Sequence, residues 1–286
     1  MPYIYSKDVK MRKGQDYAIN GSYMDSSDII YWIGIFDGHG DNQVINFIRN
    51  IKKPTWDIII RKENPMLMIF EMLLTINTRL SGSTGIISII YPTYIKCFSI
   101  GDSSVLIFKN AEKIYSNTPH NMDNPKELAR LYNRLETHDI SLEVLHSVPS
   151  ICNSLEMGTK VGLYIRFGVE KIAMSQALGH SNNTGFCPEI SVIPYNPEDK
   201  IRVVAFSDGI GDMLCISNMG TEDMQKDLFD LSSMTGDEIL EKIENRWFQS
   251  WVFNWSEIYP PVELKYKPDQ FDDLSVSIWD NYTSIA

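Results

Sequence analysis

The stretch YWIGIFDGHGDNQVINFI, Tyr31 to Ile48, sets an apolar run beside a polar break that contains two glycines. The run has the length of a buried strand, and apolar residues after the break recur three and four positions apart, as on one face of a helix. We therefore expect Asp37 and His39 to lie at a corner between a strand and a helix. Gly38 permits backbone angles that other residues avoid, so its carbonyl oxygen can point outward at a ligand. An ordinary turn, in which Asp37 bonds its own backbone, explains the same short motif equally well.

The composition describes a chain that can bury a large core. It has 286 residues, of which 43% are hydrophobic, and no repeat, low-complexity tract or long linker divides it, so we expect one domain over residues 1–286. A net charge of -11 argues against nucleic acid as the main partner. The sequence has neither an apolar stretch of membrane-spanning length nor the apolar segment of a signal peptide. We therefore expect a cytoplasmic monomer that does not bind membranes, with a nuclear location left open.

The apolar pattern predicts both strands and helices. Hairpin-like strand pairs with helices between groups favour an α+β layered fold over strict alternation. The stretches Thr137–Gly168 and Met213–Leu240 are expected to be irregular or partly helical. Asn124, Pro125 and Glu127 have the spacing of a helix start with a capping box. The predicted strands are Ile29–Phe36, Ile86–Tyr91, Tyr94–Ile100, Val105–Phe108, Ile201–Phe206 and Leu274–Trp279, and the predicted helices are Val44–Ile51, Met66–Leu80 and Leu128–Leu135.

Acidic residues stand at the ends of several predicted strands. They can converge in space although they are far apart in sequence, and three of them adjoin a glycine, which leaves room for a close approach. Hard divalent cations such as Mg²⁺ and Mn²⁺ prefer oxygen ligands of this kind. Each acid taken alone is also explained as a helix cap or turn former. The acids at strand ends are Asp37, Asp102, Asp208, Asp272 and Asp273, and Asp16 joins them after a short polar lead-in.

The cysteines carry no sign of a site. They form no C-x-x-C pair and no ligand cluster, so we expect reduced residues in the core. The four are Cys97, Cys152, Cys187 and Cys215.

An ordered set of motifs along nearly the whole chain resembles the metal-dependent Ser/Thr protein phosphatases of the PP2C (PPM) family. FDGHGD resembles the family's Asp-Gly-His-Gly signature, SGSTG its small-residue strand lead, and IGDSS its Gly-Asp-Ser-Arg segment. HNMDNPKELARL is similar to the family's Asp-His-x(n)-Pro-x-Glu-x-x-Arg stretch, and MSQALGH to Ser-Arg-Ala-Leu-Gly-Asp. AFSDGIGDML and DDLSV resemble the Ser-Asp-Gly-x-x-Asp and Asp-Asn-x-(Ser/Thr)-Val motifs. The resemblance implies two packed antiparallel β-sheets flanked by α-helices.

The resemblance also implies roles for individual residues. Asp37 would bridge two Mg²⁺ or Mn²⁺ ions, with the Gly38 carbonyl on one of them, and Asp208 and Asp272 would hold the other. Asp102 matches a position associated with a weaker third ion. The remaining implied roles are support of the first ion through waters by Asp16 and Gln15, proton donation to the leaving group by His39, and phosphate binding by Arg12.

The implied activity is hydrolysis of phosphoserine and phosphothreonine in proteins. A water shared by two ions becomes hydroxide at neutral pH, and no covalent intermediate is needed. A catalytically weak or inactive relative that serves as a binding module is the alternative. It is raised by departures from the family pattern: Gln15 for Glu, Ser104 and Gln176 for arginines, His180 for an aspartate, and Arg12 one position closer to Asp16 than usual.

Overall fold

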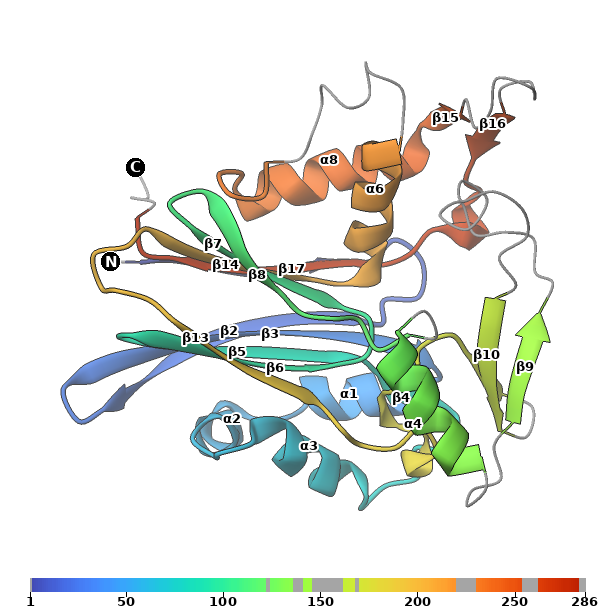
Figure 1. Cartoon of the computed structure of the whole chain (residues 1–286), viewed down its shortest axis with the longest axis horizontal. Helices are drawn as coiled ribbons and strands as arrows, with labels where there is room; N and C mark the ends of the chain where they lie inside the picture. The colour runs from blue at the N-terminus through green and yellow to red at the C-terminus, as the bar shows by residue number, and fades with distance from the viewer. Residues whose placement is uncertain are drawn as a thin grey trace.

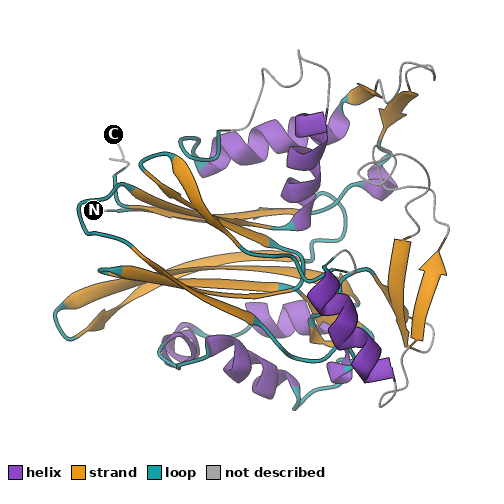
Figure 2. Cartoon of the chain, in the orientation of Figure 1, coloured by secondary structure: helices purple, strands orange, loops and turns teal. Residues whose placement is uncertain are grey.

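The computed structural model describes residues 2–121, 124–135, 141–145, 162–167, 170–219, 230–253 and 262–282. Two large antiparallel sheets lie face to face, and helices cover the outer face of each (Figure 1). The layers follow the order helix, sheet, sheet, helix, as the colouring in Figure 2 makes plain. This architecture confirms the α+β fold that the family resemblance implies.

Each large sheet joins strands that are distant in sequence. The first has the order β1 (Tyr3–Val9), β17 (Leu274–Asp280), β14 (Ile201–Phe206), β7 (Ser104–Lys109) and β8 (Glu112–Ser116). The second has the order β12 (Leu178–Gly179), β4 (Ser81–Ser83), β3 (Asp28–Gly40), β5 (Gly85–Tyr91), β6 (Tyr94–Ile100) and β13 (Glu189–Pro194), with β2 (Asp16–Asp25) paired to β3. Smaller sheets contain β9 (Ser141–Leu145), β10 (Gly162–Phe167) and β11 (Glu170–Ile172), and β15 (Ser250–Phe253) and β16 (Val262–Lys265).

The helices divide between the two outer faces. Those over the second sheet are α1 (Gln43–Arg49), α2 (Lys53–Ile60) and α3 (Pro65–Leu73), and those over the first are α6 (Asp208–Met219) and α8 (Gly236–Phe248). The helix α4 (Pro125–Leu135) lies at one end of the sheets, beside β9 and β10 in Figure 1. Short 3₁₀ turns span η1 (His180–Asn182) and η2 (Pro268–Gln270). Among the described helices, none has the length and apolar character needed to cross a bilayer.

Burial on two faces explains why the central strands are continuously apolar. Every residue of β14 is buried, because one face packs on the other sheet and the opposite face packs on helices. Ile33, Ile86 and Val203 belong to the core between the sheets. The edge strand β13 instead alternates between half-buried and exposed residues. Apolar side chains removed from water on both faces of a sheet are the main stabilising contribution to such a fold.

The helix starts follow local signals in the sequence. The side chain of Asn64 accepts a hydrogen bond from the Leu67 amide (3.0 Å), and Pro65 follows at the first position of α3. Thr235 and Glu238 form a capping box at the start of α8.

The expected corner around Asp37 is wrong in position. The strand β3 continues through Gly40, and α1 starts only at Gln43. The short strand β4 supplies the reason, because Gly38 and Gly40 pair with its residues Ser83 and Ser81. Backbone partners on β4 hold the Asp-Gly-His-Gly segment extended.

Other expected elements differ in extent. The helix predicted over Met66–Leu80 ends at Leu73, where the Thr75 hydroxyl donates to the Met72 carbonyl (2.7 Å) in competition with helix bonds. The first stretch expected to be irregular contains β9 and β10. The second contains most of α6, a turn within residues 230–235 and the start of α8. Residues 137–140, 146–161, 168 and 220–229 of these stretches lie outside the described part.

Two smaller expectations also need correction. Asn124 does accept a hydrogen bond at the start of α4, from the Lys126 amide (3.1 Å), but the Glu127 carboxylate faces Arg130, Ser175 and Gln176 rather than the helix start. Cys97 is a buried core residue as expected, whereas Cys187 is exposed. Cys152 and the side chain of Cys215 lie outside the described part.

Candidate functional site

Antiparallel pairing gathers the strand-end acids at one end of the sandwich. Asp16, the first residue of β2, is the direct register partner of Asp37 on β3. Asp208 follows β14, and Asp272 precedes β17, its neighbour in the first sheet. Asp102 follows β6. The strand ends that carry these acids lie away from the two chain termini (Figure 1).

Two of these acids are deeply buried. Asp16 is 2% exposed and Asp37 is 8% exposed. Burial raises the pKa of both carboxyls well above the usual range, because the charged form loses its hydration. The negative charges of Asp208 and Asp272 raise the same two pKa values further. The carboxyls therefore lie close enough to repel one another.

The remaining acids belong to the same electrostatic cluster. Burial and then the charge of Asp208 raise the pKa of Asp102 to about 8. The same two causes raise the pKa of Asp272 to about 7, although this residue is more exposed than Asp16 and Asp37. Asp212, one turn along α6 from Asp208, raises the pKa of both Asp102 and Asp208. The sequence analysis did not select Asp212, although its position in the quoted SDGIGD motif was a signal for it.

The cluster has features that suit a hard cation. Oδ2 of Asp16 and Oδ1 of Asp102 are buried and have no hydrogen-bond partner among the described residues. Carboxylate oxygens are the ligands that Mg²⁺ and Mn²⁺ prefer, so the donor set fits these ions. In the described part of the chain, however, no group of three or more His, Cys, Asp or Glu side chains is arranged as a ready metal cage. The ligand roles of Asp16, Asp37, Asp102, Asp208 and Asp272 stay predictions.

Glycines allow the segments that carry the acids to approach closely. A Cβ on Gly209 would lie 2.2 Å from the Asp273 carbonyl oxygen and 3.3 Å from Cβ of Asp272. A Cβ on Gly38 would lie 2.9 Å from the Gln15 carbonyl oxygen. Any larger residue at Gly209 would push α6 away from the segment before β17, and one at Gly38 would push β3 away from the segment before β2.

Asp273 organises the loop before β2. Its Oδ1 accepts from the amides of Met11 and Arg12 (2.8 Å each), and its Oδ2 accepts from the Gln15 amide (2.7 Å). This buried carboxylate is therefore committed to backbone donors. Asp272 and Asp273 are adjacent in the sequence. No pattern in the sequence indicates that Asp272 joins the acidic cluster while Asp273 accepts backbone hydrogen bonds.

The loop before β2 presents a second cation, Lys13, beside the predicted Arg12, whose role stays a prediction. The Arg12 side chain is exposed. Its backbone amide donates a hydrogen bond to Oδ1 of Asp273. The charge of Lys13 lowers the pKa of both Asp272 and His39. Lys13 was missed because the family comparison directed attention to arginine.

Gln15 holds the strand end rather than imitating a glutamate. Its side-chain amide donates to the Gly40 carbonyl oxygen (3.0 Å) and to Oδ1 of Asn42 (2.7 Å). A glutamate could not donate these bonds. The role of Gln15 in supporting an ion through water stays a prediction. In the structure its amide nitrogen donates to Gly40 and Asn42.

His39 stacks on His180, with ring centroids 4.8 Å apart. Burial, followed by the adjacent His180, lowers the pKa of His39 to about 3. Burial likewise lowers the pKa of His180 to about 4. Burial therefore favours neutral His39 at pH 7, so its predicted task of proton donation needs an added charge, such as a substrate phosphate, to raise that pKa.

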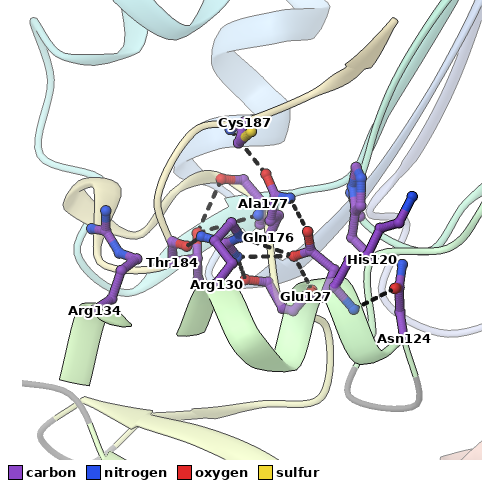
Figure 3. A network of polar contacts seen from close by, with 12 residues as sticks. His120, Asn124, Glu127, Arg130, Arg134, Gln176, Ala177, Thr184 and Cys187 are labelled. Atoms are coloured by element: carbon purple, nitrogen blue, oxygen red, sulfur yellow. Dashed lines mark hydrogen bonds and ion pairs between the residues drawn. The ribbon is translucent and has the colours of Figure 1, made fainter. Parts of the chain in front are cut away.

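A buried polar network fixes the segment that carries His180 (Figure 3). Oε2 of Glu127 accepts from Arg130 (Nε, 3.1 Å; Nη2, 3.0 Å) and from the Ser175 hydroxyl (2.6 Å), and its Oε1 accepts from Gln176 (2.8 Å). Arg130 also donates to the carbonyls of Ser175 (2.7 Å) and Thr184 (2.8 Å). The network thus ties α4 to residues on both sides of His180.

Glu127→Gln is expected to lower the free energy of unfolding by about 2 kcal/mol, because an amide donor replaces an acceptor in a fully occupied buried site. Urea denaturation measures the change. Glu112→Gln, at an exposed position on β8, serves as the matched control and should change stability by less than about 0.5 kcal/mol. Equal effects of the two substitutions on the free energy of unfolding would contradict the role of Glu127 in holding α4 to the segment around His180.

The metal-free protein is expected to lose stability as pH rises from about 4 to 8. The folded pKa values of Asp102 and Asp272, about 8 and about 7, lie above those of an unfolded chain, so the folded state binds more protons in this window. We expect the melting temperature to fall by about 5 °C between pH 5 and pH 8. Asp102→Asn should flatten this dependence, and Asp269→Asn, at an exposed position, should not. Thermal scans in a chelator test it, and a melting temperature that rises over this range would contradict it.

Comparison with known proteins finds similarity to one family in the N-terminal part of the chain. The model of the family described as "Protein phosphatase 2C" matches residues 8–137, which include Asp16, Asp37 and Asp102. The match spans less than half of the chain, so it shows that this part of the chain resembles the PP2C family. The similarity to individual proteins is low, since the chain is 25% identical over 126 residues to protein phosphatase 2C 56 of Arabidopsis thaliana. That match covers 37% of this chain and 29% of the plant protein.

Other proteins similar to this chain are equally distant from it. Protein phosphatase 2C 77 of Arabidopsis thaliana is 23% identical over 122 residues, which again amount to 29% of its length. The serine-threonine phosphatase 2C of Toxoplasma gondii matches with a TM-score of 0.57 and 13% identity, covering 98% of this chain and 94% of that structure. A C. elegans sex determining protein matches with a TM-score of 0.56 and 16% identity, covering 98% of this chain and 64% of that one. The structural matches show that the PP2C-like fold extends beyond residue 137.

Proposed function

We propose that this chain hydrolyses phosphoserine and phosphothreonine in proteins and depends on Mg²⁺ or Mn²⁺. The observation that carries the proposal is the convergence of Asp16, Asp37, Asp102, Asp208 and Asp272, whose burial, together with the repulsion of nearby carboxylates, raises their pKa values. Two cations bound there would relieve that repulsion. Such ions lower the pKa of a coordinated water and neutralise phosphoryl oxygens, which phosphate-monoester hydrolysis requires.

The chain's own residues divide the remaining tasks. Asp37 is the proposed shared ligand of the two ions, with Gly38 contributing its carbonyl, and Asp208 and Asp272 complete the ligand set. Asp102 serves a weaker third ion. These assignments rest on the family motifs together with the burial and mutual charge of the carboxyls.

Substrate binding and proton transfer fall to the basic groups around the cluster. Lys13, whose charge acts on Asp272 and His39, is placed to attract an anionic phosphate, and Arg12 contributes from the exposed part of the same loop. His39 is the proposed proton donor to the leaving alkoxide. An anionic phosphate nearby would raise its pKa and favour the protonated form needed for that step.

The alternative, a PP2C-like binding module without activity, is favoured by two observations. His39 is neutral and buried against His180, and Gln15 spends its amide hydrogens on Gly40 and Asn42. The first observation weakens proton donation by His39, and the second weakens support of an ion by Gln15. Neither removes a carboxylate ligand.

The deciding experiment measures hydrolysis of a phosphothreonine peptide and of a small aryl phosphate, with Mn²⁺ and with a chelator. The proposal expects Mn²⁺-dependent release of phosphate from both substrates. Mn²⁺ titration of the same protein supplies the independent readout. If the protein binds no Mn²⁺ at millimolar concentration, the phosphatase proposal fails and the binding-module alternative replaces it.

A further inference from the structure

A pocket of about 420 Å³ lies at the end of the sandwich opposite the acidic cluster. Pro2 and Asn281, near the two ends of the described chain, contribute to its lining, and Figure 1 shows both termini at that end. Tyr31 in its wall is six residues from Asp37 on β3, which is about 20 Å along a strand. The volume is usual for a small-ligand pocket, and the distance makes it separate from the candidate metal site.

Aromatic rings form much of this pocket. Trp279 on β17 and Ile90 on β5 are the most buried residues of the lining, at 4% and 2% exposed, whereas Tyr31 on β3 and Tyr195 after β13 are half-buried. The rings of Tyr31 and Trp279 have centroids 6.1 Å apart and are tilted by 41°, so they do not cover each other by parallel stacking. The pocket therefore combines aromatic side chains from both large sheets.

The wall is fixed by contacts within the protein. The Tyr195 hydroxyl donates to the Tyr91 carbonyl oxygen (2.6 Å), and the Tyr195 amide donates to the Thr93 carbonyl oxygen (2.9 Å). Pro92 and Pro197 also line the pocket, and the proline ring restricts the backbone there. A wall that is ordered in advance lowers the entropy cost of binding.

Asp28 gives the pocket a negative charge. It lies exposed at the start of β3, and its carboxylate makes no hydrogen bond or ion pair with a described residue. Among the described residues that line the pocket, none is a lysine or arginine. Arg61 reaches the nearby Met24 carbonyl oxygen (3.1 Å) but stacks on the Tyr23 ring (4.3 Å) instead of pairing with Asp28. The net charge of -11 adds a long-range attraction for cations.

We infer that this pocket binds an arginine side chain of a partner protein. A guanidinium is attracted to the faces of Tyr and Trp rings and pairs with a carboxylate through two parallel N–H bonds. It is planar and weakly hydrated, so it enters a space between rings more readily than the compact lysine ammonium does. Ile29 and Pro92 on the rim are exposed, which lets the partner's main chain lie outside while its side chain enters.

The test follows ¹³C-methyl isoleucine spectra of the full chain during titration with N-acetyl-arginine N-methylamide, which imitates an arginine residue within a protein. Ile29 and Ile90 line the pocket and should shift with saturation, whereas Ile210 on α6 should not. The citrulline analogue has a similar shape without the charge and should bind about 10-fold more weakly. Absence of saturable shifts up to about 20 mM probe, or equal binding of the citrulline analogue, overturns the inference.

Two further probes test the choice of ligand. The matching lysine analogue should bind at least about 3-fold more weakly, because its ammonium neither stacks on rings nor pairs through two bonds. Free L-arginine should also bind more weakly than the capped probe, since Asp28 repels its α-carboxylate. Equal binding of the lysine analogue overturns the assignment to arginine, and tighter binding of free L-arginine overturns the assignment to a protein partner.

Substitutions connect the binding to the named side chains. Asp28→Asn and Tyr31→Leu should each weaken binding of the arginine probe by about 3-fold, whereas Asp269→Asn, at an exposed position on η2, should not. If Tyr31→Leu fails to fold, Asp28→Asn on the exposed rim still gives the answer, and unchanged affinity in that variant overturns the inference. These measurements do not involve hydrolysis, so the pocket and the proposed function fail or stand independently.

Discussion

Asp37→Asn is expected to lower phosphopeptide turnover by at least about 1,000-fold and to raise the melting temperature of the metal-free protein. The activity falls because the substitution removes the carboxylate proposed to serve both ions, and preorganised charge of this kind contributes most to such rates. The stability rises because a charge leaves a buried cluster in which Asp16, Asp208 and Asp272 repel it. Phosphopeptide kinetics and thermal scans in a chelator measure the two changes on one sample.

Mn²⁺ calorimetry separates a shared ligand from a peripheral one. Asp37→Asn should weaken both central ions together, whereas Asp102→Asn should leave them bound and lower turnover less. Asp25→Asn, at the exposed far end of β2, is the matched control and should change neither property. An Asp37→Asn protein that keeps its activity and melts at a lower temperature would refute the assignment.

Arg202→Leu is expected to lower the free energy of unfolding by about 3–5 kcal/mol. Arg202 and Asp280 are register partners on β14 and β17, are 1% and 0% exposed, and form an ion pair of 2.8 Å. Arg202 also donates to the carbonyls of Leu231 (2.8 Å) and Met234. Its removal leaves a buried carboxylate without that counter-charge and two carbonyls without those donors.

Urea denaturation with two further variants isolates the buried charge. Arg202→Leu/Asp280→Asn should recover part of the loss, because it removes the uncompensated carboxylate. Lys109→Met is the matched control, since its 2.9 Å pair with Asp199 is partly exposed and should contribute at most about 1 kcal/mol. If Arg202→Leu lowers the free energy of unfolding no more than Lys109→Met does, the Arg202–Asp280 pair contributes little to stability.

The missed secondary structure had two different causes. The start of α8 carried a usable signal, the Thr235–Glu238 capping box followed by Ile239, Leu240 and Ile243 on one face. The strand β2 carried none, because it is half-exposed and its polar sequence lacks alternation. Its pairing with β3 is a tertiary contact that the local pattern does not encode.

The sequence by itself determined the buried strands and the set of acids at their ends. The strand Ile201–Phe206 was predicted with its observed limits, because burial on both faces leaves a continuous apolar run in the sequence. A carboxylate at the end of such a run marks the edge of the sheet wherever the strand is placed. Five of the acids, Asp37, Asp102, Asp208, Asp272 and Asp273, flank predicted strands and could therefore be selected without coordinates.

Only the tertiary structure decided what each polar group contacts. Asp272 and Asp273 are adjacent, yet one faces Asp208 and the other accepts three amides from the loop before β2. His39 and His180 are far apart in sequence and meet because β3 and β12 both pair with β4. Hydrogen bonds and charge interactions act over a few ångströms of space, and that proximity is set by strand pairing and packing rather than by neighbouring residues in the chain.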